Sequence, residues 1–170
     1  MLVGMSGGID SSIVCILLQK RGYEVVGVTM RMWDSHRHFK EGDIEPDYIL
    51  SARRLAQQLG IVHHVIDARA LFKNEVVDYF TSEYLNGRTP NPCVRCNRVI
   101  KWDLMRKLAD ELDCWYLATG HYANVVCLND NYYISKGRDV KKDQSYFLWD
   151  VDPSIWERVL FPLGEITKNE

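Results

Sequence analysis

Short apolar runs alternate along this chain with longer segments in which apolar residues recur every three or four positions. Runs of the first kind are typical of buried parallel strands, and segments of the second kind are typical of helices that cover a sheet. Their alternation predicts an α/β fold with a Rossmann-like parallel sheet. The predicted strands are residues 1–4, 24–30, 62–67 and 115–119.

Four helices are predicted between and after these strands. Gly22 and Gly60 follow the first two, and glycine readily adopts the left-handed conformation that ends a helix. In the last helix, apolar residues recur every four positions from Ile100 onwards, and this stripe is expected to pack on the sheet. Lys101 and Arg106 are expected on its solvent side. The predicted helices are residues 11–21, 47–59, 70–85 and 99–112.

The pattern changes after Gly120. Two short alternating segments, residues 125–128 and 132–135, flank a turn-forming cluster at residues 129–131. Such a cluster between two alternating segments predicts a β-hairpin.

The end of the chain predicts a short helix over residues 154–159. Thr167 resembles the N-cap of a helix that would follow it, so we expect the chain to continue in a longer protein. We therefore expect one catalytic domain over residues 1–150 and the start of a central domain over residues 151–170.

Composition narrows the class of protein. The 170 residues are 46% hydrophobic and 26% charged, which suits one globular domain with a sizeable core. No apolar run approaches the roughly 20 residues of a membrane helix, and no signal peptide begins the chain. We therefore expect a cytoplasmic protein without a membrane partner. Five irregularly spaced cysteines in that compartment predict no disulfide framework.

Charge adds a local signal. The formal net charge of −2 argues against a protein held on nucleic acid by its overall charge. However, residues 88–101 contain four basic residues and no acidic one, and residues 136–142 contain four basic residues and one acidic residue. These segments are either solvated loops or places where phosphate groups bind.

The segment SGGIDSS, residues 6–12, lies between the first predicted strand and the first predicted helix. Consecutive glycines let the backbone turn tightly, and the helix that follows directs its positive end at an anion. The pattern predicts a phosphate-binding loop, although a glycine-rich turn without a ligand is the alternative. It is neither a Walker A loop, which needs a lysine, nor the G-x-G-x-x-G dinucleotide fingerprint.

This loop resembles the S-G-G-x-D-S loop of the PP-loop ATP pyrophosphatases, which holds the pyrophosphate of ATP while AMP is transferred to a substrate. The resemblance implies that Asp10 acts through Mg²⁺, since a bare carboxylate would repel phosphate groups. Synthetases for NAD, GMP and argininosuccinate share the loop, so it does not fix the acceptor. The matching residues are Ser6, Gly7, Gly8, Asp10 and Ser11.

A CxxC pair, Cys93 and Cys96, stands just before or at the start of the last predicted helix, with Arg95 and Arg98 beside it. A helix N-terminus and neighbouring cations lower the pKa of a thiol, so we expect a nucleophilic thiolate here. A zinc site and two inert thiols are the alternatives. The histidines available to a zinc site are His63, His64 and His121, which lack the spacing of a zinc finger.

Four segments in order, SGGIDSS, GRTPNPCVRCN, ATGHYA and KDQSYFL, resemble the tRNA-specific 2-thiouridylase family over nearly the whole chain. The resemblance implies that Cys96 is the active-site thiol and that Asn91, Pro92 and Cys93 touch the target base. Many members carry Asp at the position of Cys93. It is therefore open whether Cys93 is a spare thiol or shares a [4Fe–4S] cluster with Cys96.

The same resemblance implies where ATP and tRNA bind. Gly120 follows a predicted strand, and ligands of parallel sheets bind at the carboxyl ends of strands. His121 is given no catalytic role. The implied ATP-binding residues are Gly4, Met5, Ser6, Gly7, Gly8, Ile9, Asp10, Ser11, Met30 and Gly120, and the implied tRNA contacts are Lys142, Asp143 and Gln144.

The implied activity is that of a tRNA-uridine 2-sulfurtransferase that uses ATP and Mg²⁺. The wobble uridine is adenylated, and sulfur from a cysteine desulfurase or a relay protein then replaces the oxygen at C2. The family uses a second cysteine from a region beyond residue 170, so Cys15, Cys114 and Cys127 are expected to be structural.

Two competing interpretations remain. One is another PP-loop nucleotidyl transferase, such as an amide-forming synthetase, and the other is a non-catalytic RNA-binding module. The family also carries an older methyltransferase label, but the chain has no S-adenosylmethionine-binding glycine motif.

Overall fold

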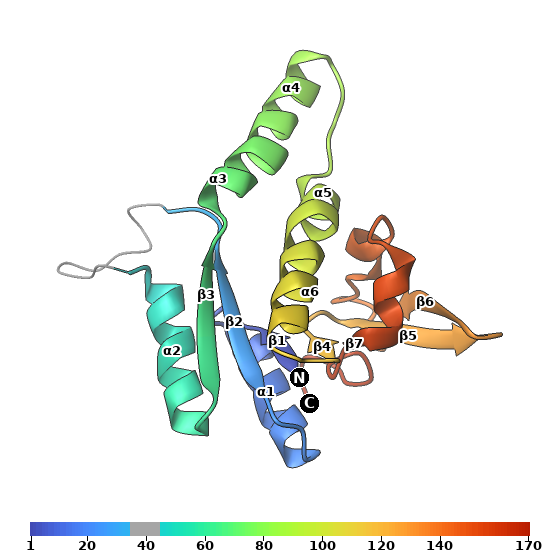
Figure 1. The fold of residues 1–170 in the computed structure, drawn as a ribbon. Coiled ribbons are helices and arrows are strands. Elements are labelled where there is room, and N and C mark those ends of the chain that lie inside the picture. Colours follow the sequence, from blue (N-terminus) through green and yellow to red (C-terminus); the bar gives the residue numbers. More distant parts are fainter. Residues whose placement is uncertain (35–44) are drawn as a thin grey trace.

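The computed structural model describes residues 1–34 and 45–170, and its centre is a five-stranded parallel sheet (Figure 1). The strand order is β3-β2-β1-β4-β7, which places the first strand of the chain in the middle. The predicted α/β fold with a parallel sheet is thus confirmed. The strands are β1 (Leu2–Gly4), β2 (Val26–Arg31), β3 (Val62–Asp67), β4 (Leu117–Ala118) and β7 (Val159–Leu160).

Helices cover both faces of this sheet. Neighbouring residues of β1 face opposite layers: Leu2 packs in a cluster with Trp102, and Val3 packs in another with Val14. Because both faces are covered there, the central strands β1 and β4 are apolar and buried on both sides. One layer contains α1 (Ile9–Lys20) and α2 (Asp47–Leu59), and the other contains α6 (Trp102–Glu111).

Local sequence patterns predicted the bounds of several elements correctly. Strand β3 and helix α2 have the predicted bounds, residue for residue. Gly60 follows α2 with φ of 65°, in the left-handed region that glycine enters without strain. None of the helices formed by the described residues is long and apolar enough to cross a membrane.

The last predicted helix begins earlier than residue 99. Asn91 caps its start, because its Oδ1 accepts the backbone N–H of Val94 at 3.2 Å, and Pro92 suits a first turn, where a missing N–H costs nothing. Cys93 therefore lies in the first turn and Cys96 in the second. The continuous run consists of α5 (Pro92–Cys96), a π-helical turn η3 (Asn97–Lys101) and α6.

A second π-helical turn interrupts the helix predicted over residues 70–85. This run projects away from the sheet, beyond the end of β3 (Figure 1). It consists of α3 (Arg69–Phe72), η2 (Lys73–Asp78) and α4 (Tyr79–Leu85).

The predicted hairpin is confirmed. Strands β5 (Ala123–Leu128) and β6 (Asn131–Lys136) pair antiparallel. Asn129 and Asp130 form the turn with φ of 51° and 60°, values that asparagine and aspartate tolerate better than most residues.

The segment after residue 150 packs onto the same core. The predicted short helix is the 3₁₀ helix η5 (Pro153–Arg158), which follows η4 (Ser145–Leu148). Strand β7 was not predicted, because two residues carry no periodicity. Its pairing with β4 extends the sheet beyond residue 150. The division of the chain at that residue stays a prediction.

Candidate nucleotide and thiol site

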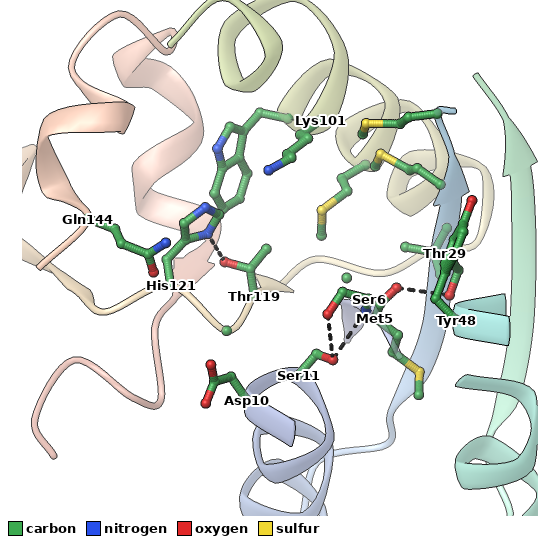
Figure 2. A pocket seen from close by; sticks show the side chains of 17 residues that line it. Met5, Ser6, Asp10, Ser11, Thr29, Tyr48, Lys101, Thr119, His121 and Gln144 are labelled. Carbon is green, nitrogen blue, oxygen red and sulfur yellow. Dashed lines mark hydrogen bonds between the residues drawn. The ribbon is translucent and has the colours of Figure 1, made fainter. Parts of the chain in front are cut away.

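A cavity of about 370 Å³ opens at the carboxyl ends of β1, β2 and β4 (Figure 2). This is the edge at which ligands of parallel α/β sheets bind. Eight of the residues assigned to ATP or tRNA from the sequence line it: Gly4, Met5, Ser6, Asp10, Ser11, Met30, Gly120 and Gln144. The remaining lining residues are Val28, Thr29, Met32, Tyr48, Lys101, Trp102, Met105, Thr119 and His121.

The glycine loop is held by its own serines. The backbone N–H of Ser6 donates to Ser11 Oγ at 3.2 Å, and Ser11 Oγ donates to the Gly8 carbonyl at 3.1 Å. Gly7 has φ of 74°, and a Cβ at this position would collide with the backbone carbonyl of Tyr48. The loop therefore needs glycine for both its conformation and its packing. Gly8 leads into α1, and the side chain of Ile9 is exposed to solvent. Neither residue lines the cavity.

The ATGHYA segment packs directly on this loop. A Cβ added to Gly120 would lie 3.1 Å from the backbone nitrogen of Ser11. That is tighter than ordinary van der Waals contact, so glycine lets the loop after β4 approach the start of α1. The two motifs, more than 100 residues apart in the sequence, thus form one wall.

Asp10 lies at the mouth of the loop with two partners. Its Oδ1 accepts the hydroxyl proton of Tyr122 at 3.2 Å and forms an ion pair with the ammonium of Lys168. Lys168 also lies 5.9 Å from the centroid of the Tyr122 ring. Burial, and then the neighbouring Asp10, raises the pKa of Tyr122. A cation, the Lys168 ammonium, thus already occupies one side of the Asp10 carboxylate.

Asp10 and the loop serines offer oxygen ligands that suit Mg²⁺, which usually takes one or two carboxylates and completes its shell with phosphate oxygens and water. Asp10 is the acidic residue among those that line the cavity. Within residues 1–34 and 45–170 no group of three or more His, Cys, Asp or Glu side chains is arranged to hold a metal ion. Cys93 and Cys96 would therefore supply two ligands of a [4Fe–4S] cluster, and the cluster stays a prediction.

Cys96 borders the cavity through a methionine. Its side chain is 6% exposed, and its Sγ lies 3.8 Å from Sδ of Met32, which lines the cavity. Burial raises the pKa of this thiol, and the charge of Lys101 opposes that shift only in part. The sequence-based expectation of a lowered pKa at Cys96 is therefore wrong for this conformation.

The flanking arginines explain the difference. Arg95 Nη2 pairs with Glu75 Oε2 at 2.7 Å, and Arg98 Nη1 pairs with Asp150 Oδ2 at 2.9 Å. Both guanidinium groups are thus directed to carboxylates on other elements, which partly neutralise their charge. Sequence proximity indicated two cations beside the thiol, but it did not show the acids that bind them.

Thiol exposure gives a first testable prediction. Cys93 and Cys127 are exposed, whereas Cys15, Cys96 and Cys114 are buried. Burial also raises the pKa of Cys15 to about 11. We expect iodoacetamide at neutral pH to modify Cys93 and Cys127 first, because the thiolate is the reacting species. Peptide mass spectrometry over time measures the order, and unfolded protein is the control in which all five thiols react. Faster modification of Cys96 than of Cys93 would contradict the raised pKa.

Of the residues assigned to tRNA contacts from the sequence, one lines the cavity and the others do not. Gln144 lines it, and its Oε1 accepts the backbone N–H of Tyr122 at 3.1 Å. Asp143 holds its own loop, accepting from the Gly137 N–H and the Ser145 hydroxyl at 2.9 Å each. Lys142 is exposed, and Asn91, Pro92 and Cys93 lie outside the cavity lining, at the start of α5.

His121 lines the cavity and packs against Trp102. One of its ring nitrogens, Nδ1, lies 2.7 Å from Thr119 Oγ1, and its ring stacks on Trp102 with centroids 6.2 Å apart. Burial, and then the charge of Lys101, lowers the pKa of His121 to about 3. The imidazole is therefore neutral at physiological pH.

Lys101 lines the cavity, which the sequence did not predict. It was expected on the solvent side of its helix with Arg106, but it is half-buried and lines the cavity. A π-helical turn contains one residue more than an α-helical turn, so η3 rotates the positions after Cys96 relative to an ideal helix. No signal in the sequence predicted that turn.

Comparison with known proteins shows the family of this chain. A family model described as a tRNA methyl transferase HUP domain matches residues 1–170. The chain is 54% identical over 170 residues to tRNA-specific 2-thiouridylase MnmA 3 of Phocaeicola vulgatus, and 51% identical over 173 residues to tRNA-specific 2-thiouridylase MnmA of Amoebophilus asiaticus. Each match covers 99% of this chain but 45% and 46% of those proteins, so the chain spans about half their length.

One solved structure shares the fold. It is described as a predicted subunit of tRNA methyltransferase from Methanocaldococcus jannaschii, and it is 20% identical with a TM-score of 0.54, over 99% of this chain and 71% of that one. The sequence motifs, the architecture and the match over the whole chain agree, and this chain belongs to the tRNA methyl transferase HUP domain family, together with the tRNA-specific 2-thiouridylases that it resembles.

Proposed function

We propose that this chain binds ATP and adenylates a tRNA uridine, as the first half of a 2-thiouridylation reaction in the cytoplasm. The observation that carries this proposal is one cavity bordered by the glycine loop, by Gly120 and by the helix that contains Cys96. Membership of the family supports tRNA as the acceptor and disfavours an amide-forming synthetase.

The cavity suggests how ATP is held. The loop from Ser6 to Ser11 presents hydroxyls and the first backbone N–H groups of α1, which suit the terminal phosphates that leave as pyrophosphate. The adenosine lies along the wall that contains Gly4 and Met30. Mg²⁺, when bound beside Asp10, neutralises phosphate charge. Asp10 must then exchange the Lys168 ammonium for the metal and its phosphate ligands.

The chemistry then proceeds in three displacements. Uridine O2 attacks the α-phosphorus, the new O–P bond forms, and pyrophosphate leaves with the electron pair of the broken P–O bond. In the second, the terminal sulfur of a persulfide attacks C2, and AMP leaves with the electrons of the C2–O bond. In the third, the Cys96 thiolate attacks the remaining S–S bond. 2-Thiouridine leaves as its thiolate, and Cys96 forms a disulfide with the cysteine that carried the persulfide. A cysteine desulfurase or a relay protein supplies the persulfide.

Contacts to tRNA are proposed at two places. Asn91, Pro92 and Cys93 lie at the start of the Cys96 helix, where they would meet the base, and Gln144 lines the cavity with Lys142 and Asp143 just before it in the chain. The basic segment 88–101 contributes less than its charge suggests, because its three arginines are paired with carboxylates. Counterion release on tRNA binding should therefore be small for this chain.

Replacement of Asp10 tests the proposal. We expect Asp10→Asn to reduce tRNA-dependent exchange of labelled pyrophosphate into ATP by at least about 100-fold, because the neutral amide is a poor Mg²⁺ ligand. The lost Asp10–Lys168 ion pair is exposed to solvent, so its loss should change the stability little. Exchange at increasing Mg²⁺ concentration measures the first effect, and thermal unfolding measures the second.

The acceptor is tested in the same assay. Exchange that requires tRNA with a wobble uridine supports the proposal, and exchange driven by a carboxylate and an amine instead supports a synthetase. A wild-type chain that binds no ATP in the presence of Mg²⁺ supports the non-catalytic RNA-binding interpretation.

A further inference from the structure

Lys101 provides the fixed positive charge among the described residues that line the cavity. The other basic side chain in that lining, His121, is neutral. Lys101 faces the loop residues Ser6 and Ser11 from the opposite wall (Figure 2). A nucleotide that placed its terminal phosphates on the loop would therefore extend toward this ammonium.

Lys101 also differs from its neighbours in having no ion pair with a described residue. Arg98 pairs with Asp150 at 2.9 Å, and Lys107 pairs with Asp103 at 2.8 Å on the same helix. The positions one helical turn before and after Lys101 hold Asn97, Arg98, Leu104 and Met105, none of them acidic. Lys101 thus lines the cavity without a carboxylate partner among the described residues, and its ammonium is free to bind an anion there.

The π-helical turn connects Lys101 to the thiol. Lys101 ends η3 and Cys96 immediately precedes it, so one wide turn of the helix joins the two residues. Lys101 and His121 both line the cavity, which Cys96 borders through Met32, and the charge of Lys101 acts to lower the pKa of both Cys96 and His121. The anion that meets Lys101 is therefore the part of the nucleotide nearest to the reacting base.

We propose that Lys101 is a catalytic residue that binds the α-phosphate of the nucleotide. This rests on the proposed adenylation, in which the α-phosphorus is attacked by uridine O2 and pyrophosphate leaves. The terminal phosphates lie on the loop and the adenosine lies against the opposite end of the cavity, so the α-phosphate crosses the space that Lys101 faces. The ammonium stabilises the negative charge of the non-bridging oxygens in the attack and of AMP when it leaves.

The test compares AMP with adenosine, which differ by the α-phosphate alone. Isothermal titration calorimetry of the 170-residue chain with each ligand should show that Lys101→Met weakens AMP binding by roughly 10- to 100-fold, the effect of losing a hydrogen bond to a charged group. Adenosine binding should stay within about twofold. Lys101→Arg should keep most of the AMP affinity. Lys107→Met, on an exposed face of the same helix, is the matched control and should change neither.

The possible outcomes distinguish a failure of the Lys101 role from a failure of the proposed ATP site. If the wild-type chain binds neither ligand, the proposed ATP site fails and the role of Lys101 fails with it. If the wild type binds both and Lys101→Met binds AMP as well as the wild type does, the inference alone is overturned. An equal loss of adenosine binding would show a structural effect and also overturn it. A variant that binds tRNA less tightly in filter binding while AMP affinity is unchanged would assign the ammonium to an RNA phosphate instead.

Discussion

Gly7→Ala should abolish nucleotide binding at the loop, with a loss of affinity of at least about 100-fold. Gly7 has φ of 74°, and its added Cβ would collide with the Tyr48 carbonyl, so the loop must move away from α2. A displacement of about 1 Å at a catalytic site is enough to cost about 100-fold in rate, and phosphate-binding N–H groups are similarly demanding. Titration calorimetry with ATP and Mg²⁺ measures this effect.

Gly87→Ala is the matched control for that variant. Gly87 has φ of 72°, nearly the same as Gly7, but no atom lies within 4 Å of a Cβ added there. Both variants therefore introduce comparable backbone strain of about 1 kcal/mol or more, but only Gly7→Ala introduces a collision. Similar losses of ATP affinity in the two variants would show that strain, and not the position of the loop, determines binding.

Trp102→Ala should have the largest effect on stability. Trp102 is 2% exposed, and its ring makes edge contacts with Trp156 and Phe161 at centroid distances of 5.4 and 5.8 Å. Truncating a buried tryptophan to alanine costs about 3–5 kcal/mol, because apolar contact is lost and a cavity remains. The melting temperature should fall by roughly 6–20 °C for a domain of this size.

Trp149→Ala is the control for that prediction. Its side chain is 65% exposed, so its removal should change the free energy of unfolding by less than about 0.5 kcal/mol. Denaturant titration of the two variants and the wild type measures both values. If Trp102→Ala unfolded at the same denaturant concentration as the wild type, α6 would not be held on the sheet through this side chain.

The site also depends on how π-helical turns direct side chains. The turn η3 follows Cys96 immediately, and it directs Lys101 into the cavity although the helical pattern places it in solvent. Such turns arise when tertiary packing outweighs the preference for α-helical hydrogen bonds, and they occur often at functional sites. A helical periodicity read from the sequence cannot show them.

The sequence by itself determined four of the five strands of the parallel sheet, most of the helices, the hairpin and the phosphate-binding motif. These depend on local properties: buried runs form strands, glycine takes left-handed conformations at Gly60, and asparagine and aspartate form the turn at Asn129 and Asp130. The order of the motifs also pointed to the family that the whole chain matches. Information of this kind lies within a few neighbouring residues, or in fixed strings of residues.

Only the tertiary structure decided which charges remain unpaired around the cavity. Arg95 and Arg98 flank the thiol in the sequence, but acids from other elements bind them, and burial then raises the pKa of Cys96. Conversely, Lys101 gains its position in the cavity, and Lys168 reaches Asp10 from the other end of the chain. The strength of a charge depends on its burial and on partners brought together by folding, and residues distant in the sequence supply both.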